Sequence, residues 1–173
     1  MHIGSLPQTS RQYFFFLTVV HSAMLLGQVM FGAIAWFLQQ RGDMGSQDLA
    51  SLSVLRLVVP GVLIAGLLGN QFLTRTRLPQ LQQQARLGDK LLGYRTLLII
   101  RYALLEAPVL LALVTYLLTG EMTVLLVAAA IAAYFASLRP TRAGTIQALQ
   151  LRDDEQRQVQ DPEAVVIPLA SSP

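Results

Sequence analysis

Residues 96–118 read TLLIIRYALLEAPVLLALVTYLL, an apolar run interrupted by Arg101 and Glu106. At a rise of about 1.5 Å per residue, a helix over this range is long enough to cross about 30 Å of hydrocarbon. An ionised carboxylate at the centre of a bilayer costs roughly 2.5–3.5 kcal/mol on insertion scales. The run therefore predicts a transmembrane helix, and Glu106 is its first candidate for a functional residue.

The composition of the whole chain also indicates a membrane protein. Of its 173 residues, 53% are hydrophobic and only 13% are charged, with a mean hydropathy of +0.49. Few soluble domains have such a composition. The apolar stretches predict an all-α membrane protein with a bundle of four transmembrane helices, over about residues 13–38, 52–73, 96–118 and 122–138. The first stretch exceeds the roughly 7–15 apolar residues of a signal peptide, so we expect it to stay as a helix.

The distribution of basic residues predicts the orientation in the membrane. Lys and Arg accumulate in cytoplasmic loops. Between the second and third stretches, and after the fourth, the chain carries Arg75, Arg77, Arg86, Lys90, Arg95, Arg139 and Arg142. We therefore expect both termini to be cytoplasmic, an N-in/C-in topology, and interpret the net charge of +3 as a topology signal rather than as nucleic-acid binding.

We expect three regions along the chain. Residues 1–12 form a polar N-terminal lead, and residues 13–140 form the transmembrane domain. Residues 141–173 form a cytoplasmic segment, which starts as a short amphipathic helix through Ile146, Leu149 and Leu151. From Asp153 onward the density of charge, Gln and Pro predicts a mobile, disordered tail. In the middle loop, Pro79 suits a first helical position, so we expect the third helix to begin before the membrane.

Small residues at four-residue spacing predict where helices pack. Lipid provides no hydrophobic drive for helix association, so small side chains that let backbones approach carry much of the specificity. The two stripes are Gly61, Ala65 and Gly69 on the second helix, and Ala128, Ala132 and Ala136 on the fourth. The sequence leaves open whether these stripes pack within one bundle or between copies of the chain.

Polar residues inside the predicted helices form a candidate intramembrane site. Its members are Glu106, His21, Arg101, Tyr102 and Gln28. His21 and Gln28 are seven residues apart and share a helix face. Tyr102 precedes Glu106 by four residues, which favours a local contact. Arg101 is level with Asn70 and can extend toward the cytoplasm.

Depth in the membrane predicts a partner for Glu106. Both Glu106 and His21 lie about 12–14 Å from the cytoplasmic ends of their helices, so they are level and can pair if those helices are neighbours. Pro108 has no N–H for the carbonyl of Leu104, which predicts a kink and leaves that oxygen free for water or a side chain. The pair could be a structural clamp, a proton or cation site, or part of a pocket for a small molecule or lipid.

Other chemistries find no support in the sequence. There is no cysteine, and His2 and His21 are the only histidines. We therefore expect no metal site, no haem or other cofactor, and no catalytic residues. The expected partners are the lipid bilayer and other membrane subunits or a second copy of the chain, without nucleic acid.

The sequence of the third predicted helix resembles two groups of membrane proteins. The segment RTLLIIRYALLEAPVLLALVTYLL resembles the carboxylate-bearing helix of rotary ATPase proteolipid (c) subunits, and the likeness in arrangement covers about residues 61–118. This resemblance implies that Glu106 binds a proton or sodium ion. The longer YRTLLIIRYALLEAPVLLALVTYLLTG, followed by LRPTR, is similar to uncharacterised small four-span membrane proteins of Bacteroidetes-type bacteria. That resemblance implies a multi-pass protein of the bacterial inner membrane.

The sequence thus supports two hypotheses about function. The first is a non-enzymatic accessory or scaffolding component of the inner membrane, which acts through helix packing and its cytoplasmic segments. The alternative is a proton- or ion-linked membrane element that uses Glu106 with His21.

Overall fold

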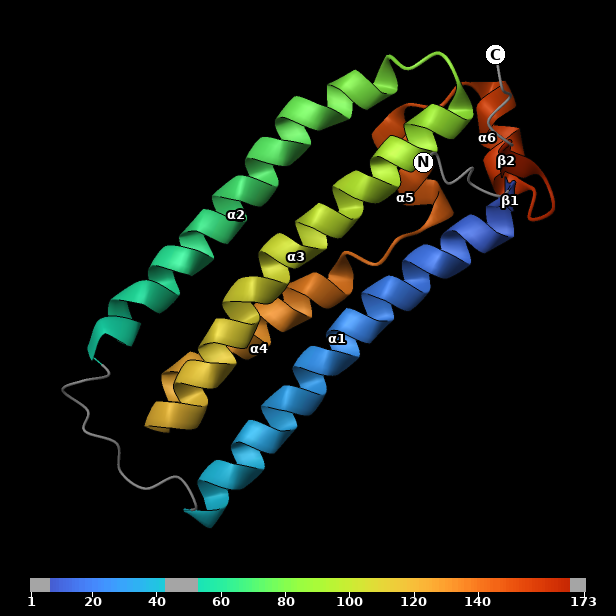
Figure 1. The fold of residues 1–173 in the computed structure, drawn as a ribbon. Coiled ribbons are helices and arrows are strands. Elements are labelled where there is room, and N and C mark those ends of the chain that lie inside the picture. The colour runs from blue at the N-terminus through green and yellow to red at the C-terminus, as the bar shows by residue number, and fades with distance from the viewer. Residues whose placement is uncertain (1–6, 43–52, 169–173) are drawn as a thin grey trace, which may run out of the picture. The chain divides into compact units, whose positions relative to one another are not determined.

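A computed structural model shows an all-α chain with one small sheet, and it describes residues 7–42 and 53–168 (Figure 1). The helices are α1 (Ser10–Arg41), α2 (Ser53–Gln82), α3 (Leu87–Thr119), α4 (Met122–Ser137), α5 (Arg142–Leu149) and α6 (Asp153–Gln160). Strands β1 (Gln8–Thr9) and β2 (Val165–Ile167) pair antiparallel. The predicted loop between the first two helices lies mostly outside the described residues.

The chain divides into two compact units that share the long helices. The terminal unit consists of Met1–His21, Leu73–Ile100 and Pro140–Pro173. The helical unit consists of Ser22–Phe72 and Arg101–Arg139.

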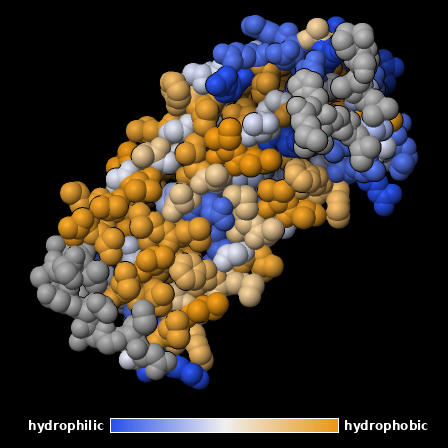
Figure 2. All heavy atoms as spheres, viewed as in Figure 1, coloured by the Kyte–Doolittle hydropathy of each residue, from blue (hydrophilic) through white to orange (hydrophobic). Residues whose placement is uncertain are grey.

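Three helices, α1, α2 and α3, are long and apolar enough to cross a membrane, or up to four spans if the bent pair α4 and α5 counts as one. Hydrophobic side chains cover much of these helices on the face drawn in Figure 2. Soluble monomers rarely expose apolar patches of this kind. Large exposed apolar side chains include Phe15, Leu26, Phe37, Leu57, Leu68, Phe72 and Leu126. By helix length and composition, the chain is therefore a candidate multi-pass membrane protein.

The long helices extend past the predicted apolar stretches. Helix α3 begins at Leu87, so the expectation that it starts before the apolar run is confirmed. Helix α2 continues to Gln82 and contains Pro79, so the predicted helix start at Pro79 is wrong. The reason is that Gln, Arg and Leu residues around Pro79 are good helix formers and continue the second helix beyond its hydrophobic part.

Within the helical unit, α3 contacts each of the other three helices. Leu113 of α3 lies against Gly32 of α1, where an added Cβ would meet it at 3.5 Å. Leu104 packs against Gly69 of α2 in the same way. A buried cluster joins α3 to α2 and α4 through Val59, Val109, Ala112, Leu113, Ala128 and Ile131. Helix α3 is therefore the element on which this unit is packed.

The most closely packed glycine of this unit lies against the carbonyl that Pro108 leaves without a helical donor. A Cβ placed on the buried Gly66 would lie 2.5 Å from Leu104 O and 3.3 Å from Pro108 Cγ. The oxygen predicted to be open to water or a side chain thus faces the backbone of α2, in a position suited to a Cα–H···O contact. Gly66 is missing from the predicted stripe, of which Gly69 contacts α3 and Gly61 meets no described atom within 4 Å.

The terminal unit joins the two ends of the chain. Gln8 pairs with Ile167 and Thr9 with Val165 (Figure 1). The backbone N–H groups of Ser10 and Arg11 donate to Ala164 O and Pro162 O at 3.0 Å each. These bonds fasten the first turn of α1 to the segment that follows α6.

The predicted mobile tail is wrong for residues 153–167. This segment forms α6 and β2, and Val159, Val166 and Ile167 are buried. Its polar composition is misleading because a few apolar side chains, together with the ladder to β1, are enough to hold it against its neighbours. Helix α5 lies where the amphipathic segment is expected. Leu149, its last residue, is buried, and so is Leu151 just after the helix.

We predict that Gly66→Ala destabilises the protein by about 1–3 kcal/mol, because a methyl group would overlap a backbone oxygen that cannot move without shifting α3. The matched control is Gly61→Ala, which gains helix propensity in open space and should be neutral or stabilising by up to about 1 kcal/mol. Unfolding of the purified protein in mixed micelles with increasing dodecyl sulfate measures both values. Equal stability of the two variants would show that α2 and α3 are not in close contact at Gly66.

Candidate functional site

Glu106 lies in the middle of α3 and is half-buried. No hydrogen bond or ion pair joins its carboxylate to another residue in the described part of the chain. His21 is 4% exposed, but it belongs to the terminal unit whereas Glu106 belongs to the helical unit. The pairing of His21 with Glu106 therefore stays a prediction.

Arg101 bridges α3 and α2 near the end of the helical unit. Its Nε donates to Oδ1 of the buried Asn70 at 2.7 Å. This bond agrees with the prediction that Arg101 is level with Asn70. The guanidinium is half-buried, so one neutral acceptor orients it while the rest of the group stays accessible. The contact is a cross-link between helices rather than a counter-ion for Glu106.

Tyr102 is buried and links α3 to the end of α4. Its hydroxyl donates to Leu138 O at 3.1 Å. Its ring meets that of Phe135 edge to face, with centroids 5.3 Å apart. These contacts connect Tyr102 to α4, and its local contact with Glu106 stays a prediction.

Gln28 is the most unusual polar residue of the helical unit. It is 2% exposed, and both Nε2 and Oε1 are buried without a hydrogen-bond partner among the described residues. Leaving a buried amide unsatisfied costs about 1–3 kcal/mol, and more where no water can replace the partner. Its side chain lines a groove together with Ala128, Ala132 and Ala136. All three residues of the predicted alanine stripe of α4 thus border an open space.

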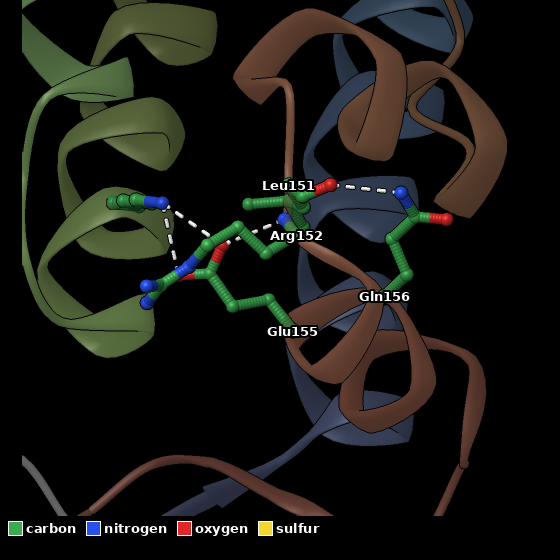
Figure 3. Close-up of polar contacts among 5 residues, drawn as sticks. Leu151, Arg152, Glu155 and Gln156 are labelled. Carbon is green, nitrogen blue, oxygen red and sulfur yellow. Dashed lines mark hydrogen bonds and ion pairs between the residues drawn. The ribbon is translucent and has the colours of Figure 1, made fainter.

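A second polar centre lies in the terminal unit, where Lys90 of α3 meets Glu155 of α6. Lys90 Nζ lies 2.9 Å from both carboxylate oxygens, and the two residues are 4% and 3% exposed. Glu155 Oε2 also accepts from the Arg152 backbone N–H at 3.0 Å, which satisfies the first turn of α6 (Figure 3). The pair fastens the C-terminal segment to the start of α3.

Three further side chains support this centre. Ser10 Oγ donates to Val159 O at 2.6 Å, and Tyr13 Oη donates to Leu91 O at 2.8 Å. Gln156 Nε2 donates to Leu151 O at 2.8 Å (Figure 3). An added Cβ on Gly88 would meet Pro168 at 3.3 Å, so the end of the described chain also lies against α3. The starts of α1 and α3 and the segment around α6 therefore share one network.

Electrostatics explain how Glu155 stays charged. Burial acts to raise the pKa of Glu155, but the hydrogen bonds from Lys90 and the Arg152 backbone, with the charges of both residues, outweigh it. The net pKa lies below the ordinary value of 4.5. A carboxylate with a lowered pKa stabilises the fold above its unfolded pKa, and this contribution is lost as the pH falls through the folded value.

Sequence reasoning missed this pair for two reasons. Lys90 is one of several basic residues that indicate topology, and Glu155 lies in the region predicted to be mobile. The short apolar run Ala164–Ile167 after a polar segment was the available signal, because it favours a buried strand. Nothing in the sequence pairs Lys90 with Glu155 across 65 residues.

Two findings concern metal sites and similarity to known proteins. No group of three or more His, Asp or Glu side chains capable of holding a metal occurs within residues 7–42 and 53–168. Neither a family model, nor a curated protein, nor a solved structure matches the chain.

We predict that Lys90→Met destabilises the terminal unit by about 3–5 kcal/mol, because it leaves the Glu155 carboxylate buried and unpaired. The control is Lys90→Met combined with Glu155→Leu, which replaces the pair by apolar groups and should be close to wild type. Hydrogen exchange of the α6 and β2 backbone amides measures the stability of both variants.

In wild type, protection beyond that of a free peptide should fall as the pH drops below about 4.5.

The double variant lacks the carboxylate and should not show this acid-induced loss. A single variant as well protected as the double variant would contradict the buried pair.

Proposed function

We propose that the chain is a non-enzymatic scaffolding or accessory protein of the bacterial inner membrane, with four spans and both termini in the cytoplasm. The pairing of β1 with β2 is the observation that carries this proposal, because it brings the two ends of the chain into one unit. Helices that each cross the bilayer return the chain to its starting side only in an even number. Helix α4 therefore provides the fourth crossing, and the resemblance to small four-span proteins supports the location.

The terminal unit supports a role in docking. Its buried ion pair and strand ladder hold the C-terminal segment in place. Arg75 and Arg77 are exposed near the end of α2, and Arg86 is exposed on the connection between α2 and α3. A rigid, positively charged surface at the membrane favours an acidic protein surface as partner. The joined chain segments and this exposed basic surface favour assembly as the function that this geometry serves best.

The four-span topology predicts which positions share a side of the membrane. The chain has no cysteine, so single cysteines can be introduced at exposed Gln40, Gln84 and Gln158 without removing native ones. In right-side-out vesicles, a membrane-impermeant maleimide should label Gln40→Cys directly, and the other two only after the vesicles are opened. Labelling of Gln158→Cys from the outside would contradict the fourth crossing.

Glu106→Gln distinguishes the scaffolding role from a proton- or ion-linked role. The substitution keeps size and hydrogen bonding but removes the negative charge. For a scaffold, we expect unchanged proton and sodium flux in reconstituted liposomes, together with copurification of the same partners from native membranes. Flux that Glu106→Gln abolishes would contradict the proposal, and a double-mutant comparison with His21→Ala would then test their pairing.

A further inference from the structure

The helical unit contains a groove between α1, α3 and α4. Its volume is about 390 Å³, within the range of small-molecule sites, which are mostly apolar with a few polar groups. Leu25, Gln28 and Gly32 line it from α1, Val109 from α3, and Ala132 and Ala136 from α4. None of its lining residues is charged. The α4 residues that line the groove have small side chains, so the space between the helices stays unfilled.

Gln28 is the one polar residue among the described residues that line the groove, and both its amide atoms are buried, so a ligand reaches them when the side chain rotates toward the groove. Its Nε2 is a donor and its Oε1 an acceptor, and neither has a partner among the described residues. A bilayer has no water in its core to replace those partners. A ligand that satisfies this amide must therefore offer both an acceptor and a donor. A hydroxyl group does both with one oxygen.

We propose that this groove binds an uncharged, mainly hydrocarbon molecule of the bilayer that carries one hydroxyl group, which hydrogen-bonds to Gln28. The apolar lining accommodates the hydrocarbon part, and the lack of charged lining residues disfavours an ionic headgroup. Long-chain alcohols and diacylglycerols share this chemistry.

Size disfavours a neighbouring helix as the occupant. Along α4 the lining runs from Leu125 to Ala136, a length of about 16 Å at the helical rise. A helix of that length and about 10 Å diameter fills on the order of 1,200 Å³, which is more than the groove provides. A flexible chain can follow the available space without moving α1 away from α4.

Photolabelling tests the proposal with the full-length protein in phosphatidylcholine nanodiscs. The probes are a diazirine-bearing hexadecanol and a diazirine-bearing hexadecane of the same length. We expect the alcohol to label peptides that contain α1 and α4, about tenfold more efficiently than the alkane, as one to two hydrogen bonds would give. Equal labelling by the two probes would overturn the role of Gln28.

Variants separate the groove from the rest of the lipid-facing surface. Ala132→Phe fills the groove and should reduce labelling by the alcohol at least fivefold. Its control is Ala130→Phe, on an exposed position of α4 that does not line the groove and should have no effect. Gln28→Leu keeps the shape and should lower labelling by the alcohol to that by the alkane. Equal labelling of the two phenylalanine variants would contradict the site.

Competition identifies the source of the ligand. Unlabelled hexadecanol and a dioleoylglycerol are added separately, and the stronger competitor shows whether the groove prefers a single-chain alcohol or a neutral glycerolipid. Failure of both to compete would overturn the proposal. So would a crosslink between two copies of the chain from benzoylphenylalanine placed at Ala129, because a helix would then occupy the groove.

Discussion

The packing of α1, α2 and α4 onto α3 is the constraint on which the helical unit depends. Its tightest point is Gly66, where the backbone of α2 faces the Leu104 carbonyl. That oxygen lacks its usual helical donor because Pro108 follows four residues later. A single missing N–H therefore creates a polar group that the neighbouring helix must cover, and only a glycine approaches closely enough to do so. Pro108 of α3 and Gly66 of α2 therefore act together in packing these two helices.

The polar residues of the long helices divide into groups with different roles. Arg101 and Tyr102 bind neighbouring helices through Asn70 and Leu138, so they belong to packing. Gln28 has buried amide atoms without partners and lines the groove, which makes it the polar residue best suited to a ligand. Glu106 is half-buried and has no hydrogen-bonded or ion-paired neighbour in the described residues. The helix that carries it, α3, contributes to the fold mainly through its packing surface.

The terminal unit shows a different way of stabilising a polar segment. Residues 153–167 have too few apolar side chains to fold alone, yet Lys90, Ser10 and the β1 strand each provide a partner from elsewhere in the chain. The Lys90–Glu155 pair is buried. Removing one partner therefore costs more stability than the intact pair contributes. Such a pair fixes where the segment attaches, as the proposed docking role requires.

The sequence by itself determined the helical class, the long apolar segments, the start of α3 before its apolar run and the level of Arg101 with Asn70, because these depend on composition and on the rise of one helix. Only the tertiary structure decided that Gly66 rather than Gly61 meets α3, that Ala132 borders a groove with Gln28, and that Glu155 is buried against Lys90. Each of these depends on which faces of separate elements meet, and residue spacing within one helix carries no information about that.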